Sequence, residues 1–455
     1  MKIKFFGGTE AVTGSNFLVE IKGPRGSESQ ILIDCGLHQG SNFCEKHNFE
    51  PFPYDPQKIK AVFVTHAHID HTGLLPKLYR QGFKGKVYST PPTKDFAYEL
   101  LLDSENILFR EAERENKEPL YSKKDIDGLM GVWEGIDYGT PIEVGGFSVT
   151  LRNSGHILGS SSILVKADDR LVVFSGDLGN YRPPIIKESE VLDIPADYCL
   201  IESTYGNRLH EGLELRKGIL ENVIEETVKT KGVLMIPSFA MERTQEILYE
   251  LNELVENGRI PRVPIFIDSP LAIKLTRVYQ KYSYYFNDEA SRLVKKGDAL
   301  FFFPGLKMTL NKDESIAIND VPSPKVIIAG SGMSQGGRIL HHEKRYLSDP
   351  NSAILFIGYQ AYGSLGRQIL EGAKSVKILG EDIAVRCRVR AIGAYSAHAD
   401  KRKLLEWLYP MRSTLKKVFV VQGEKEASEA LASAIKDKLA VDARAPSIKE
   451  EVVLE

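Results

Sequence analysis

The chain has 455 residues, enough for two or three domains, and its 42% hydrophobic and 26% charged residues are typical of a globular protein. Its 59 Lys and Arg against 61 Asp and Glu exclude a net positive field that would attract a polyanion, so nucleic-acid binding must be local. An early Gly7-Gly8, short apolar runs and four cysteines without a C-x-x-C pair predict a cytoplasmic protein with no membrane partner and no cysteine-zinc site.

The first two hundred residues alternate short β-branched runs with turns, a pattern typical of strands. The predicted strands are 3–6, 17–21, 30–34, 61–65, 87–89, 147–152, 161–166, 170–175 and 198–202. Helical patterns are few in this half, and the best are 74–81 and 93–116. We therefore expect sheets packed together with helices outside.

From Gly212 the pattern changes to alternating helices and strands. The predicted helices are 212–229, 241–256 and 271–286, and the predicted strands are 232–237, 263–268, 325–329 and 353–358. This βαβ order predicts a parallel sheet covered by helices on both faces. After Ile378 short strands return, 385–392 and 417–421, around a helix at 400–408. We therefore predict an α/β chain in which one domain, 206–377, is inserted into another made of 1–205 and 378–455.

A cluster of metal-binding residue types follows the predicted strand 61–65. It reads His66-Ala-His68-Ile-Asp70-His71 and lies on a strand-to-helix turn, where loops usually present functional groups. His66 and His68 are two apart in extended chain, so their side chains can point the same way, while Asp70 and His71 approach from the start of the helix. Three imidazoles and a carboxylate suit zinc or manganese better than metals that prefer thiolates.

This run resembles the signature of the metallo-β-lactamase fold, an αββα sandwich. Three more segments look like the family's other motifs: Asp34 in Leu-Ile-Asp-Cys-Gly, His156 in Asn-Ser-Gly-His and Asp177 in Phe-Ser-Gly-Asp. The resemblance implies that His66, His68 and His156 bind one zinc, that Asp70 and His71 bind a second zinc or a manganese, and that Asp177 bridges the two. Two such ions can hold a hydroxide between them. Asp34 is expected to orient a ligand histidine.

Five further segments are similar to those of β-CASP nucleases, a branch of the same fold. They are 201–206, 237–240, 268–270, 330–333 and 396–400. The resemblance spans nearly the whole chain and is closest to prokaryotic RNA-processing members. It implies an inserted β-CASP domain and a single-stranded RNA substrate, although DNA is not excluded. Because hydroxide on two metals would attack phosphorus directly, we expect hydrolysis to leave 5′-phosphate and 3′-hydroxyl ends.

A proton donor is needed for the ribose oxygen that leaves, and a histidine held by a carboxylate suits this task. His398 is the candidate acid and Glu202, at the end of a predicted strand, is its candidate partner. The resemblance implies the same two roles. Taken singly, both residues also fit ordinary surface positions. The predicted catalytic residues are Asp34, Asp70, Glu202 and His398.

A glycine-rich loop, 330–338, follows the predicted strand 325–329 and is expected to open a helix. Backbone amides and the helix dipole could then bind a substrate phosphate. The expected phosphate-binding residues are Ser331, Gly332, Met333, Arg338 and Arg367. His341 and His342 fit a helical pattern and are expected to be packing or surface residues.

The sequence departs from the family at Gln422. RNA-directed members carry a histidine here that binds the second metal, whereas DNA-directed members tend to carry valine. A carboxamide oxygen is a weaker ligand, so the second site is expected to bind loosely, to favour a harder ion or to fill with substrate. Two alternatives stay open: a small-molecule hydrolase of the same fold acting on a thioester or lactam, and a weakly active or non-catalytic RNA-binding protein. A monomer and a homodimer are equally compatible with the sequence.

Overall fold

The computed structural model describes residues 1–23, 28–40, 46–210, 216–358, 360–393 and 396–455, and the chain folds into two compact units. The first unit contains 1–209 and 397–455, and the second contains 210–396. The chain returns to the first unit later than the predicted residue 378. The reason is that β19 (Arg388–Ile392) pairs in parallel with β16 (Ala353–Ile357) and so extends the sheet of the second unit.

Two seven-stranded sheets form the first unit within the described residues. One has the order β22-β1-β2-β3-β4-β5-β6, with strands Glu451–Val453, Lys2–Phe5, Phe17–Lys22, Glu28–Ile33, Ile59–Phe63, Lys86–Ser89 and Trp133–Gly135. The other has the order β21-β20-β11-β10-β9-β8-β7, with strands Ala443–Arg444, Lys417–Val421, Tyr198–Glu202, Arg170–Phe174, Ser161–Ala167, Phe147–Asn153 and Ile142–Val144.

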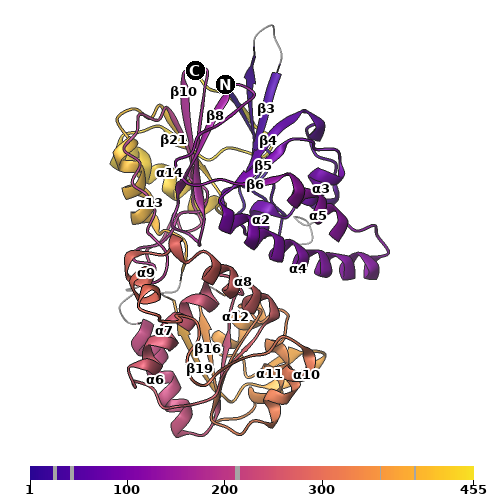
Figure 1. Cartoon of the computed structure of the whole chain (residues 1–455), viewed down its shortest axis with the longest axis vertical. Helices are drawn as coiled ribbons and strands as arrows, with labels where there is room; N and C mark the ends of the chain where they lie inside the picture. Colours follow the sequence, from indigo (N-terminus) through magenta and orange to yellow (C-terminus); the bar gives the residue numbers. More distant parts are fainter. Residues whose placement is uncertain (24–27, 41–45, 211–215, 359, 394–395) are drawn as a thin grey trace. The chain divides into compact units, whose positions relative to one another are not determined.

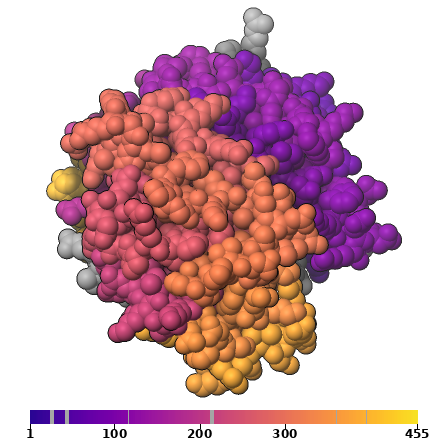
Figure 2. Space-filling model, turned by 60° about the horizontal axis from the view of Figure 1, so that its bottom comes forward, coloured from indigo at the N-terminus to yellow at the C-terminus, as the bar shows by residue number. Residues whose placement is uncertain are grey.

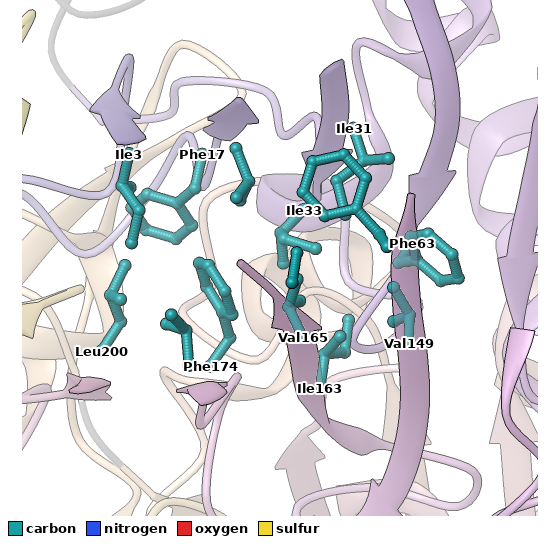
Figure 3. Close-up of a cluster of buried hydrophobic side chains, with 14 of the residues drawn as sticks. Ile3, Phe17, Ile31, Ile33, Phe63, Val149, Ile163, Val165, Phe174 and Leu200 are labelled. Carbon is teal, nitrogen blue, oxygen red and sulfur yellow. The ribbon is translucent and has the colours of Figure 1, made fainter. Parts of the chain in front are cut away.

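A hydrophobic core joins these two sheets face to face (Figure 3). One sheet contributes Ile3, Phe17, Ile31, Ile33 and Phe63, and the other contributes Val149, Ile163, Val165, Phe174 and Leu200. Alternate side chains of a strand point to opposite faces, so the outer face of each sheet needs separate cover. The arrangement is the predicted sandwich.

Helices cover the outer faces of both sheets (Figure 1). On one side lie α2 (Ile69–Thr72), α3 (Leu75–Arg80), α4 (Pro91–Glu115) and α5 (Lys123–Val132), and on the other lie α13 (Lys401–Leu408) and α14 (Lys425–Leu439). The long α4 begins where the Thr90 hydroxyl accepts from the Thr93 amide, with a proline at the first position, and ends at a left-handed Asn116. Two of these helices, α5 and α14, were not predicted.

The second unit contains a six-stranded parallel sheet in the order β14-β13-β15-β12-β16-β19. Its remaining strands are Leu306–Met308, Ile265–Asp268, Lys325–Ala329 and Val233–Pro237. The packed helices are α6 (Arg216–Lys229), α7 (Arg243–Glu256), α8 (Pro270–Lys281), α9 (Asp288–Lys295), α10 (Lys312–Ala317), α11 (Ile339–Tyr346) and α12 (Leu365–Leu370). Figure 2 shows the surface that these pink-to-orange segments present.

Residues 211–215, included in a predicted helix, lie outside the described residues. Within the described chain, every helix is too short or too polar to cross a membrane.

Candidate metal centre

The candidate site is built where strands of the first unit end. Asp34 follows β3, His66 to His71 follow β4, His156 follows β8, Asp177 follows β10, Glu202 ends β11 and Gln422 follows β20. In one sheet β3 runs parallel to β4, and in the other sheet β10, β11 and β20 run parallel to one another. Carboxyl ends of parallel strands meet at one edge of a sheet. The topology therefore gathers polar groups that lie far apart in the sequence.

Four potential ligand atoms converge at this edge, all within 4.8 Å of one another. His68 Nδ1 lies 3.0 Å from His66 Nε2 and 3.3 Å from His156 Nε2. Asp177 Oδ2 lies 3.4 Å from His66 Nε2 and 3.6 Å from His156 Nε2. The His66 and His156 rings are buried.

These separations fit a tetrahedral zinc ion. Zinc–nitrogen and zinc–oxygen bonds of about 2.0–2.1 Å place the ligand atoms of a tetrahedron roughly 3.3 Å apart. Three imidazoles and one carboxylate are also the donor types that zinc prefers. The four residues therefore have both the chemistry and the spacing of a zinc site.

Asp34 organises the neighbouring part of the site. Its buried carboxylate accepts from Thr65 N at 2.8 Å, Thr65 Oγ1 at 2.9 Å and Ser15 Oγ at 3.1 Å, and it lies 2.7 Å from His71 Nδ1. A proton on His71 Nδ1 is thereby favoured, which directs His71 Nε2 toward Asp177 Oδ1 at 3.4 Å and Asp70 Oδ2 at 3.9 Å. Sequence reasoning missed Thr65 and Ser15, because nothing local marks a hydroxyl as the partner of a distant carboxylate.

Burial and mutual charge shift the pKa values of this cluster. Burial lowers the pKa of His66 well below its usual value, and His71 lowers it further. Burial raises the pKa of Asp70 to about 6, with Asp177 adding to the rise and His71 opposing it. Burial opposes ionisation of Asp177, but His71 and His66 hold its pKa well below the usual range. Burial also opposes a charged His71, yet Asp177 and Asp34 raise its pKa well above the usual value. The buried carboxylates are thus stabilised by nearby positive charge, which a proton or a metal ion can supply.

His398 and Glu202 meet beside the four-ligand cluster. His398 Nδ1 lies 3.3 Å from Glu202 Oε2 and 3.9 Å from Asp177 Oδ2, and the His398 and His156 ring centroids are 4.5 Å apart. Glu202 is buried and also accepts from the Leu178 amide at 2.6 Å. The backbone fixes His398 as well, since Ala399 N donates to Leu178 O at 2.7 Å. The structure therefore brings together the two residues predicted as proton donor and partner.

Gln422 reaches the other side of Asp177. Its Nε2 lies 2.9 Å from His71 Nε2 and 3.0 Å from Asp177 Oδ1, and the side chain is buried. These are two of the groups expected to hold the second metal. All the residues predicted as ligands or catalytic groups therefore belong to one connected cluster.

The predicted phosphate loop has a different structure from the one expected. Helix α11 begins at Ile339, eight residues after Ser331, so Gly332 and Met333 do not lie at its first turn. The amides of Ser331 and Ile339 donate to Gly336 O and Gly330 O within the loop. Bonds inside the loop thus use amides that a phosphate would require.

The two predicted phosphate-binding arginines have partners within the second unit. Arg338 donates to the buried Asp268 carboxylate at 2.7 Å and to the backbone oxygens of Thr309 and Leu310. Arg367 pairs with Glu371 at 2.7 Å, one turn along the same helical segment. Arg338 therefore has a tertiary role that its sequence position did not indicate.

Three family models match consecutive parts of the chain. The metallo-beta-lactamase superfamily matches residues 11–215, the Beta-Casp domain matches 244–369, and the Zn-dependent metallo-hydrolase RNA specificity domain matches 382–446. The first and third matches contain every residue of the cluster described above. Both of the expected family segments are thus present in the expected order.

Similar proteins match over most of the chain. Ribonuclease TTHA0252 of Thermus thermophilus is 38% identical over 95% of this chain and 95% of its own. Transcription termination factor FttA is 32% identical in Methanosarcina mazei, over 100% of this chain and 72% of that protein, and 33% identical in Thermococcus kodakarensis, over 98% and 70%. The crystal structure of a protein of unknown function from Enterococcus faecalis V583 superposes with a TM-score of 0.59 at 14% identity, over 100% of this chain and 99% of that one, and shares the fold.

Proposed function

The chain belongs to the β-CASP family of metallo-β-lactamase-fold hydrolases, and from this premise we propose that it is a ribonuclease that hydrolyses single-stranded RNA to 5′-phosphate and 3′-hydroxyl ends. The observation that carries the proposal is the convergence of four zinc-ligand atoms beside the His398–Glu202 pair. The cytoplasmic location predicted from the sequence is part of the same proposal.

His66, His68, His156 and Asp177 would hold the metal. A zinc ion there would polarise a phosphoryl oxygen and lower the pKa of a water to about 7. The buried imidazoles suit this role because burial keeps the pKa of His66 low and its lone pair available. A second ion between Asp70, His71 and Asp177 would complete the dinuclear centre predicted from the sequence.

His398 would supply the proton that the leaving ribose oxygen requires. Glu202 lies at its Nδ1, so a proton on that nitrogen is held and the other ring nitrogen exchanges its proton with the substrate. The Leu178 amide fixes Glu202, and the Leu178 carbonyl fixes the chain next to His398. One backbone segment thereby positions both members of the pair.

The relatives favour RNA cleavage over the alternatives. The RNA specificity domain match and the end-to-end similarity to a ribonuclease argue against a thioester or lactam substrate. The termination factors match at lower identity and are longer than this chain, so they give weaker support for a role at the transcription complex. The intact ligand set argues against a non-catalytic protein.

End-labelled RNA and DNA of one sequence would test the proposal. We expect the purified chain to cut the RNA with zinc or manganese and to stop with chelator, and we expect His68→Ala to be inactive. His341→Ala, which changes an exposed histidine of the second unit, is the matched control and should cut normally. Ligation and phosphatase treatment of the fragments would identify their ends. Absence of cleavage in every metal, with a folded chain, would reject the ribonuclease assignment.

A further inference from the structure

Gln422 is the one point where the cluster departs from the dinuclear pattern. We propose that its side-chain amide completes the second site without a metal, so that the chain binds one zinc tightly and a second divalent ion at least tenfold more weakly. The inference rests on the proposed zinc site but not on the identity of the substrate.

The backbone fixes the position of Gln422. The residue follows β20 in a left-handed backbone conformation, with φ of 51°, which residues other than glycine rarely adopt. Its N–H donates to Gly8 O at 2.7 Å, and its carbonyl accepts from Thr204 Oγ1 at 3.2 Å. Gly8 also packs closely, since a Cβ placed there would lie 3.3 Å from Gln422 Cγ. The side chain is therefore held in the site.

The amide occupies the place between two groups that would otherwise hold the second ion. His71 Nδ1 lies 2.7 Å from Asp34 Oδ2, so the opposite ring nitrogen, Nε2, faces into the site. Gln422 Nε2 lies 2.9 Å from His71 Nε2 and donates to Asp177 Oδ1 at 3.0 Å. The amide is therefore in contact with both groups at once.

The zinc site and the amide use different oxygens of Asp177. Oδ2 lies toward His66 and His156, whereas Oδ1 lies toward His71 and Gln422. The amide therefore leaves the four-ligand cluster complete. This division explains how one site can stay strong while the other is weakened.

Binding a second ion would require the amide to turn. The turn would give up the hydrogen bonds to His71 and Asp177 and would offer a neutral amide oxygen in place of the family's imidazole. An oxygen of this kind is a weaker ligand for zinc than an imidazole nitrogen. Each effect lowers the affinity of the second site and neither acts on the first.

Metal content measured by mass spectrometry would test the inference on the full chain after equilibration with buffered zinc. We expect one zinc per wild-type chain and two per Gln422→His chain. In the double variant Gln422→His with His71→Ala the count should return to one, because the added zinc would lose its second imidazole. Two tightly bound zinc ions in the wild type, or none, would overturn the proposal.

Calorimetric titration of the wild-type chain with zinc provides a second measurement, which stays decisive if Gln422→His fails to fold. One tight and one weak binding event would support the inference, and two events of equal affinity would reject it. RNA cleavage plays no part in either measurement. Loss of the ribonuclease assignment and loss of this inference are therefore distinguishable.

Discussion

Each unit of the molecule contains a buried aspartate at the end of a parallel strand, and the two have different surroundings. Asp268 in the second unit is met by four donors at short distances: Thr309 Oγ1 and Ser315 Oγ at 2.6 Å, Arg338 at 2.7 Å and His342 Nε2 at 2.8 Å. Asp177 in the first unit is met by one amide donor, Gln422 Nε2 at 3.0 Å, and by the Nε2 atoms of His66, His71 and His156 at the longer distances of 3.4–3.6 Å.

The difference indicates a stabilising role for Asp268 and a metal-binding role for Asp177. A carboxylate with a full set of donors needs no cation, and such a cluster joins distant segments of the chain. Burial opposes ionisation of Asp268, but His342 and the hydroxyl donors hold its pKa below the usual range. Around Asp177 the three imidazole nitrogens lie at the spacing of metal ligands, which leaves a place where a metal ion can supply the positive charge. The residue types are similar, and the spacing of the atoms around each carboxylate separates the two roles.

Replacing the aspartate of the metal site should give the largest effect on function. Asp177→Ala removes one ligand of the four-atom cluster and a neighbour of His71. We expect zinc to be lost from the purified chain and RNA cleavage to fall about 1,000-fold or more, since the metal supplies several kcal/mol of transition-state stabilisation. Metal analysis and single-turnover cleavage would measure both. Retained zinc with normal cleavage would contradict the assignment of the site.

The equivalent change in the second unit should affect stability instead. Asp268→Ala leaves the half-buried Arg338 and the buried His342 without their anion. Removing one partner of a buried ion pair costs about 3–5 kcal/mol, so urea unfolding should begin at a clearly lower concentration. Arg367→Ala, which breaks an exposed pair, is the control and should change stability by less than about 1 kcal/mol.

Zinc analysis of Asp268→Ala completes the test. The folded variant should keep the wild-type zinc content, because all four proposed zinc ligands lie in the first unit. Loss of zinc from a folded Asp268→Ala chain would show that the two clusters are not independent.

The sequence predicted the site better than it predicted the surroundings of the site. His66, His68 and Asp70 are close along the chain, and the chemistry of metal ligands makes such spacing informative. Arg338 was assigned to a phosphate because its partner, Asp268, is 70 residues away and only tertiary structure brings the two together. Gln422 was recognised as a departure, but its contacts with His71 and Asp177 depend on strand pairing that no local pattern records.

The fold shows the same division between local and distant information. The predicted strands of the first half agree with the structure to within about two residues. The segment 385–392 was correctly recognised as strand-forming but was assigned to the wrong side of the second boundary, because sequence alone does not say which sheet accepts it. Helix α14 was missed even though Ala427, Leu431 and Ile435 recur every four residues on its buried face.

Asp34 provides an intermediate case that sharpens the comparison. Like Asp268 it is surrounded by donors that include an imidazole, but this imidazole, His71, has its other ring nitrogen directed into the metal site. In the Gln422→His background we expect Asp34→Asn to weaken the second zinc by about 10- to 100-fold, as is usual when a ligand loses its supporting carboxylate. The first zinc should bind nearly as before. Equal loss at both sites in a calorimetric titration would show that Asp34 supports the whole cluster.

Glu343, next to His342, tests whether hydrogen-bond donors decide the protonation state of a buried carboxyl group. Its replacement has the smallest expected effect. Burial raises its pKa to about 8, and the hydroxyl of Ser334 opposes the rise only partly. The unfolded chain loses this proton near pH 4.3, so the contribution to stability is complete below that pH and is lost as the pH rises to about 8. Glu343→Gln cannot ionise and should therefore gain about 1 kcal/mol over the wild type between pH 6 and pH 7 in urea unfolding. Glu371→Gln, at an exposed position, should keep the wild-type slope with pH, and an equal slope in Glu343→Gln would refute the raised pKa.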